Sequence, residues 1–63
     1  MKRYYIYYQY RDDKDRYSLI TVCESFREAK NLFNTDYNGF ISVELTKDNK
    51  TITRVLKRYQ ANK

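Results

Sequence analysis

The sequence lacks most of the side chains that carry chemistry in proteins. Its 63 residues include no histidine, no proline and no tryptophan, with one glycine and one cysteine. A single cysteine cannot form an intramolecular disulfide, and the usual ligands of a zinc site are missing. No histidine is present to activate the thiol of Cys23, which we predict to be structural. We therefore expect no enzymatic activity, no bound metal and no cofactor.

Long apolar runs and linker-like segments are also missing. No stretch approaches the ~20 apolar residues of a membrane-spanning helix. The two basic residues near the start are followed by alternating aromatic and polar residues, which is not typical of a secretory signal. An unpaired cysteine fits a reducing compartment. The sequence thus predicts a single domain over residues 1–63 that lies in the cytoplasm, or in the host cell cytoplasm if phage-encoded, without contacting a membrane.

Tyrosine dominates what is present, and its spacing at the start of the chain predicts a β-hairpin. In residues 3–11, tyrosine and isoleucine recur with a period of two, which is typical of a strand. The charged run at residues 12–15 predicts a turn. Residues 16–23 contain a β-branched cluster and predict the second strand.

A capping box predicts a helix after this hairpin. Ser25 and Glu28 have the spacing at which a hydroxyl and a carboxylate each bind a free backbone N–H at a helix start. We expect the helix to run from residue 26 to residue 34 and to end in the segment 34–39. The apolar residues on its predicted inner face are Phe26, Ala29, Leu32 and Phe33.

The second half of the chain predicts another hairpin. Ile41, Val43 and Leu45 alternate with polar residues, and the turn residues 47–50 follow them. Residues 51–58 predict a fourth strand, although the apolar residues in 51–60 also fit helical spacing. The predicted fold class is α+β, a small four-stranded antiparallel sheet with one helix on a face in the order ββαββ. The alternative order is ββαβα.

Register and charge together predict a binding face on the sheet. In a hairpin that turns at Asp13 and Lys14, one face carries Tyr4, Ile6, Tyr8, Tyr10, Tyr17, Leu19, Thr21 and Cys23, and we assign this face to the helix and core. The opposite face carries Tyr5, Tyr7, Ile20 and Val22, and its predicted rim is Arg3, Gln9, Arg11, Arg16 and Ser18.

The positive charge is concentrated at the two ends of the chain. The net charge is +5, and residues 1–11 and 49–63 contain no acid. If the first and last strands lay close together, their cations would form one field that attracts anions, although Lys and Arg also serve solubility.

Two resemblances point toward mobile DNA. The abundance of Tyr, Lys, Asn and Ile, which have AT-rich codons, resembles the small accessory proteins of phages and mobile elements. Residues 5–30, with a Tyr-x-Tyr strand, a charged turn, a strand and Ser25 to Lys30, resemble the arm-type DNA-binding domain at the start of phage integrases. That family implies a sheet packed on a helix, with strand residues in the DNA major groove. It has three strands before the helix and a Gly- and Lys-rich turn, where this chain has two strands and an acidic turn.

The sequence therefore predicts a small non-enzymatic binding protein that binds nucleic acid through a basic, tyrosine-rich sheet face. The alternative is a protein–protein interaction module, such as a phage-encoded inhibitor of a host enzyme or defence system, because Tyr and Arg also dominate protein interfaces. A homodimer through the face of Tyr5, Tyr7, Ile20 and Val22 is a further prediction. The residues predicted to bind the nucleic acid or the partner are Arg3, Tyr5, Tyr7, Arg11, Arg16, Arg54, Lys57 and Arg58.

Overall fold

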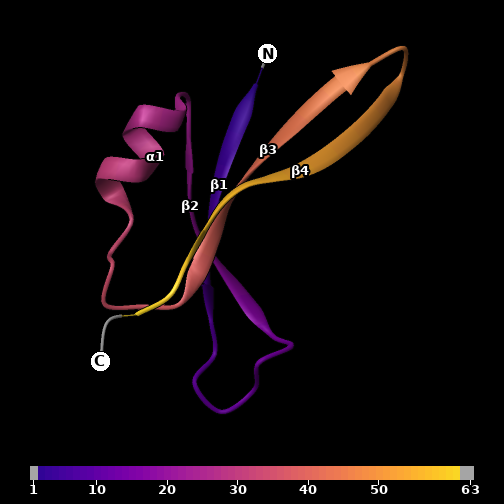
Figure 1. Ribbon diagram of the computed structural model, residues 1–63. Coiled ribbons are helices and arrows are strands. Elements are labelled where there is room, and N and C mark those ends of the chain that lie inside the picture. The colour runs from indigo at the N-terminus through magenta and orange to yellow at the C-terminus, as the bar shows by residue number, and fades with distance from the viewer. Residues whose placement is uncertain (1, 62–63) are drawn as a thin grey trace.

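The computed structural model describes residues 2–61 as a four-stranded antiparallel sheet with one helix on a face (Figure 1). This confirms the predicted α+β class and the order ββαββ. The alternative with a helix near the end of the chain is wrong, because residues 50–59 form a strand. The elements are β1 (Arg3–Gln9), β2 (Tyr17–Cys23), α1 (Phe26–Leu32), β3 (Gly39–Lys47) and β4 (Lys50–Tyr59).

A tight turn explains why the last segment pairs back as a strand. Asp48 and Asn49 connect β3 to β4 and have φ values of 53° and 64°. Two successive residues with positive φ are typical of a type I′ turn, whose twist matches that of a hairpin. Asp and Asn tolerate this left-handed conformation better than most residues do. The sequence of the turn therefore favours strand pairing over a continued helix.

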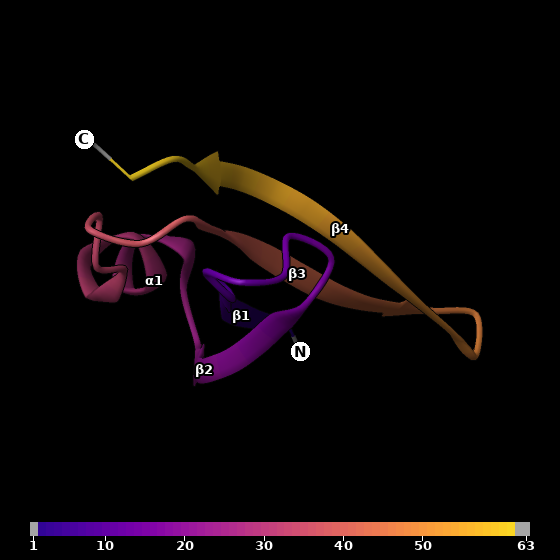
Figure 2. The ribbon, with the colours of Figure 1, turned by 90° about the horizontal axis from the view of Figure 1, so that it is seen from below.

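The sheet has the strand order β2-β1-β3-β4, so β1 is an inner strand and β2 and β4 are the outer ones (Figure 2). β1 pairs with β2 along one edge and with β3 along the other. The first and last strands are therefore not neighbours, because β3 lies between them. The predicted merging of the cations at the two ends of the chain depends on these strands lying close together, and they are not adjacent in the sheet.

Helix α1 begins where the capping box predicts. Ser25 has extended backbone angles, and its hydroxyl accepts a hydrogen bond of 3.1 Å from the backbone N–H of Glu28. The helix ends at Leu32, two residues before the predicted end, because Phe33 leaves the helical conformation with ψ of 124°. Within residues 2–61, no helix is long and apolar enough to cross a membrane.

Replacing Ser25 by alanine is expected to lower the free energy of unfolding by about 0.5–2 kcal/mol, because the N–H of Glu28 loses its acceptor. Urea denaturation followed by circular dichroism measures this difference. Ser25→Asp is the control, since its carboxylate can also accept the hydrogen bond, and it should keep the stability of the unmodified chain. Equal stability of Ser25→Ala and Ser25→Asp would contradict the capping role.

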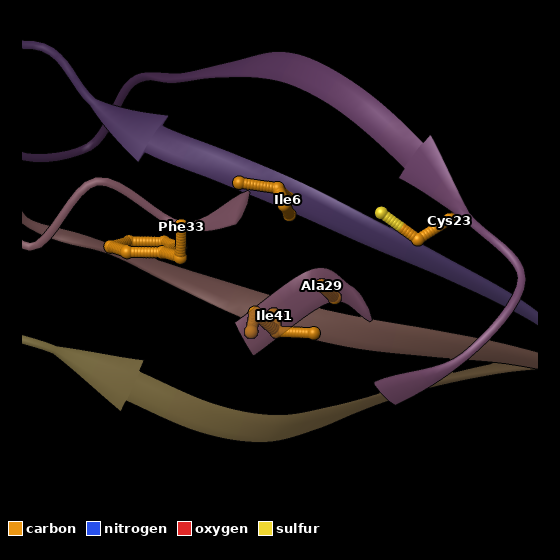
Figure 3. Close-up of a cluster of buried hydrophobic side chains, with 5 residues drawn as sticks. All are labelled: Ile6, Cys23, Ala29, Phe33 and Ile41. Carbon is orange, nitrogen blue, oxygen red and sulfur yellow. The ribbon is translucent and has the colours of Figure 1, made fainter. Parts of the chain in front are cut away.

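The core lies between α1 and the sheet. Five buried side chains form one cluster that joins the first three strands to the helix (Figure 3), namely Ile6, Cys23, Ala29, Phe33 and Ile41. The partly buried rings of Tyr4, Tyr8, Phe26 and Tyr59 pack around this cluster. The phenol oxygen of Tyr8 also accepts a hydrogen bond of 2.9 Å from the backbone N–H of Asn34, which ties the segment after the helix to β1.

A β-bulge in the first hairpin changes the predicted faces. Tyr4, Tyr5 and Ile6 pair with β2 in the predicted register, but the register shifts by one residue after Ile6, next to Ile20. A one-residue shift moves the following side chains to the other face. Tyr17 and Leu19 therefore share a face with Gln9 and Tyr7, and the prediction that they face the helix is wrong.

The aromatic contacts on both sides of the sheet account for the shift. The ring of Tyr8 contacts two other rings. It meets Phe33 edge to face with centroids 5.0 Å apart and stacks on Tyr37 with centroids 4.9 Å apart. Ser18, a small residue, stands opposite Tyr8 in β2. The bulge thus leaves room for these rings on the helix side and places Tyr17 against Phe40 on the other side.

Candidate functional site

The face of the sheet opposite α1, here called the open face, carries most of the exposed aromatic and apolar strand residues. Residues directly opposite each other on neighbouring strands share a face. One row crosses all four strands, and its members are Leu19, Tyr7, Phe40 and Arg58. A second row consists of Val22, Tyr5, Ser42 and Val55.

An aromatic cluster lies in and beside the first row. The rings of Tyr7 and Phe40 stack with centroids 4.9 Å apart and an interplanar angle of 22°. Tyr17 contacts Phe40 edge to face, also at 4.9 Å. The guanidinium of Arg58 lies 5.7 Å from the centre of the Phe40 ring, within the range of a cation–π contact. Two rings and one cation, each from a different strand, therefore meet around Phe40 of β3.

Two members of this cluster were not predicted as site residues. Phe40 stands one position before Ile41, so the alternation that assigns Ile41 to the core places Phe40 on the opposite face. That signal was available in the sequence. Tyr17 reaches the open face only because of the bulge at Ile20, which no residue type in the hairpin marks.

The middle of the open face is closed by its own side chains. Ser42 is fully buried although α1 lies on the other side of the sheet, and its hydroxyl has no hydrogen-bond partner among residues 2–61. Its neighbours across the strands are the larger residues Tyr5 and Val55. A small residue between larger ones lets them close over it. The available surface is therefore formed by the surrounding rings and apolar side chains.

The predicted cations do not form one patch. Arg58 lies on the open face, whereas Arg54 and Lys57 stand opposite Val43 and Ile41 and so share the helix face. The ammonium of Lys57 lies 4.9 Å from the Tyr59 ring, which stacks on Phe33 in the core. Lys57 thus covers the edge of the core.

The remaining predicted cations lie at the ends of the sheet. Arg3 stands opposite Glu44 at the start of β1. Arg11 and Arg16 lie outside the strands, whereas the prediction placed them opposite each other in the hairpin. The Arg16 guanidinium lies 4.8 Å from the Tyr10 ring. Of the eight predicted residues, the structure brings Tyr7 and Arg58 together through Phe40, with Tyr5 in the adjacent row.

A shallow groove of about 350 Å³ adjoins the aromatic cluster. Its polar lining comes from the ends of β1 and β4 and from the segment before β3. The side-chain amide of Gln9 donates a 2.7 Å hydrogen bond to the carbonyl of Lys14. The side-chain oxygen of Asn38 accepts a 2.6 Å hydrogen bond from the N–H of Ala61. The residues that line this groove include Gln9, Tyr17, Asn38 and Arg58.

The single thiol is unsuited to nucleophilic chemistry. Cys23 is buried in the core, and burial raises the pKa of its thiol, with a further increase from the carboxylate of Glu28. A raised pKa keeps the thiol protonated at neutral pH, and the thiolate is the reactive form. Within residues 2–61, no group of three or more His, Cys, Asp or Glu residues is placed to hold a metal ion.

Neither a model of a protein family, nor a curated protein sequence, nor a solved structure matches this chain. The likeness of residues 5–30 to integrase arm-type domains is one of sequence pattern. The candidate site is accordingly defined by its geometry, as an aromatic cluster with one arginine on the open face of an antiparallel sheet.

Proposed function

We propose that the protein binds single-stranded nucleic acid on the open face of its sheet and acts by binding, without catalysis. The observation that supports this most is the meeting of Tyr7, Tyr17 and Phe40 with the guanidinium of Arg58. Aromatic rings on a sheet can stack with unpaired bases, and a nearby cation can contact the phosphate backbone. The net charge of +5 attracts a polyanion from a distance.

The exposure of the rings indicates where a base would stack. Tyr7 and Phe40 cover part of each other and are half-buried. Tyr17 is 39% exposed, and its ring and that of Phe40 meet edge to face. Tyr17 therefore offers the most accessible ring of the cluster, and the groove beside it gives a neighbouring nucleotide room next to Arg58.

The distribution of cations favours a single strand over a duplex. A duplex presents its phosphates outward and hides the faces of its bases, so its non-specific binding depends on many cations along one surface. Here Arg54 and Lys57 face away from Arg58. The open face has few cations and several rings. Such a surface suits the stacking of unpaired bases better than contacts to the phosphates of a duplex.

Fluorescence anisotropy with a labelled oligothymidine at low salt tests the proposal. Tyr17→Leu keeps apolar volume but removes the ring, and we expect it to weaken binding by about 1–3 kcal/mol for each base stacked there. Arg58→Gln should lower the log–log salt slope by about 0.7, the value for one phosphate contact on a single strand. Arg54→Gln is the matched control, because it removes the same charge from the same strand on the other face, and it should leave the slope nearly unchanged.

Two results would contradict the proposal. Absence of binding at low salt, where attraction is strongest, would exclude nucleic acid as the ligand. Equal effects of Arg54→Gln and Arg58→Gln would show that binding is diffuse attraction to net charge. A blunt-ended duplex of the same length serves as the comparison ligand and should bind more weakly than the single strand.

A second candidate function is protein binding, which the apolar edge of the open face favours. Leu19, Ile20 and Val22 are 49%, 49% and 48% exposed. Such a contiguous apolar strip is typical of interaction surfaces. In that case the chain is an interaction module, for example an inhibitor of another protein, and its binding to the partner depends on Leu19 and Val22 and tolerates salt.

A further inference from the structure

Carboxamide side chains gather around the groove beside the aromatic cluster. Both glutamines of the chain, Gln9 and Gln60, line this groove together with Asn38. They come from the end of β1, from the segment that follows β4 and from the segment that precedes β3. Figure 1 shows the last two segments close together near the C-terminus. Among the described residues that line the groove, Arg58 alone is charged.

Hydrogen bonds to the backbone fix the orientation of two of these amides. The side-chain nitrogen of Gln9 donates to the carbonyl of Lys14 at 2.7 Å. The side-chain oxygen of Asn38 accepts from the N–H of Ala61 at 2.6 Å. A backbone carbonyl only accepts and a backbone N–H only donates, so neither amide can be reversed without losing its bond. The backbone N–H of Gln9 also donates to the carbonyl of Asn38 at 2.8 Å, which holds the two residues side by side.

The two oriented amides offer complementary hydrogen-bonding groups to a ligand. Among residues 2–61, the side-chain oxygen of Gln9 and the side-chain nitrogen of Asn38 make no hydrogen bond. The first group is an acceptor and the second is a donor. The edge of a nucleobase also places a donor next to an acceptor, as N3–H and O4 do in thymine, and carboxamides are side chains that bind such edges. An uncharged acceptor and donor suit a base edge better than a phosphate.

The same groove contains partners for the other parts of a nucleotide. Tyr17, whose ring is the most accessible of the cluster, lines it, and so does Arg58. A ring stacks on the face of a base, and a guanidinium binds a phosphate. The volume of about 350 Å³ lies at the lower end of the range for small-ligand pockets, about 300–1,000 Å³. This size suits one nucleotide.

We propose that the groove holds one base of the bound strand and recognises its edge. The side-chain oxygen of Gln9 accepts a hydrogen bond from the base, the side-chain nitrogen of Asn38 donates one to it, and Tyr17 contacts its face. This inference rests on the proposed function and adds that affinity depends on the hydrogen bonds of the base as well as on stacking. Because the backbone holds both amides before the strand arrives, little further ordering is needed on binding.

Two short oligomers separate recognition of the edge from stacking. One is oligothymidine, and the other carries 2,4-difluorotoluene in place of every thymine, a ring of nearly the same shape that lacks strong hydrogen-bonding groups. Fluorescence anisotropy of the unmodified chain at low salt measures both affinities. We expect the second oligomer to bind about tenfold more weakly, which is the effect of one or two net hydrogen bonds.

Two variants assign this difference to the amides. Gln9→Met and Asn38→Leu keep side chains of similar size without the amide. Each should weaken binding of oligothymidine about threefold to tenfold and leave binding of the difluorotoluene oligomer unchanged. Asn31→Leu is the matched control, because Asn31 is exposed on α1, which packs on the other face, and it should keep the full difference. Circular dichroism of each variant shows that it is folded.

The possible failures are distinguishable. Equal affinity of the unmodified chain for the two oligomers would overturn this inference and leave the proposed function standing, because stacking alone would then account for binding. A difference that persists in both Gln9→Met and Asn38→Leu would also overturn it. Binding of neither oligomer would overturn the proposed function, and this inference with it.

Discussion

Replacing Phe33 by alanine is expected to unfold the protein at room temperature. Phe33 is 5% exposed, its ring stacks on Tyr59 at 4.0 Å and it meets Tyr8 edge to face at 5.0 Å. Removing a buried phenylalanine ring costs about 3–5 kcal/mol. A core of this size supplies about the same amount in total. The far-UV circular dichroism of Phe33→Ala should therefore show loss of the sheet.

Leu32→Ala is the matched control for this substitution. Leu32 is adjacent in sequence but 55% exposed, and we expect its replacement to change stability by no more than about 0.5 kcal/mol. Phe33→Leu retains part of the ring volume and should remain folded with a lower melting temperature, so the effect can be measured even if Phe33→Ala cannot be purified. A melting temperature of Phe33→Ala equal to that of the unmodified chain would show that this ring is not in the core.

Replacing Gly39 by alanine is the second substitution with a large expected effect. A Cβ atom at this position would press against the backbone carbonyl oxygen of Tyr7 and lie 3.0 Å from Cζ of Phe33. The carbonyl belongs to the inner strand β1, so it cannot move without disturbing the β1–β3 pairing. Overpacking a fitted core costs about 1–3 kcal/mol, and more where backbone must shift. Thermal unfolding should show a large decrease in melting temperature.

Thr46→Ala provides the comparison for Gly39→Ala. Thr46 lies on the same strand but is exposed, and its replacement should have little effect. If Gly39→Ala is as stable as Thr46→Ala, then β1 and β3 are not as close at this point as the structure shows. Combining Gly39→Ala with Phe33→Leu should not restore stability, because the severe contact is with backbone.

The elements of the fold were predictable because their signals are local. The hydroxyl of Ser25 accepts a hydrogen bond from the N–H of Glu28, only three residues away, so a segment of four residues is enough to predict the helix start. The turn at Asp48 and Asn49 joins strands that are adjacent in sequence. Strand period and turn chemistry sufficed for the hairpins. The order of strands in the sheet depends on contacts between distant segments, and local patterns do not specify it.

The candidate site was only partly predictable because it depends on register. Tyr5 and Tyr7 follow from alternation alone, whereas Arg58 reaches the open face only because of a bulge in β4. The bulge beside Ile20 reverses the faces of Tyr17 and Leu19, and it arises from ring packing around Tyr8 that involves Phe33 and Tyr37. The second bulge, in β4, separates Arg54 from Arg58 although their spacing suggests one face. Each bulge shifts a register by one residue, which is enough to divide a predicted patch between two faces.

The position of β1 between two hairpins also bears on how the chain folds. The β1–β2 and β3–β4 pairs join neighbouring segments of the sequence, and a β-hairpin closes within about 1–10 μs. The β1–β3 pair joins segments more than 30 residues apart, from Tyr8 with Gly39 to Arg3 with Glu44. Closing that larger loop costs more chain entropy before any contact compensates for it. We therefore expect the two hairpins to form independently, and their meeting along β1 and β3 to limit the rate at which the sheet is completed.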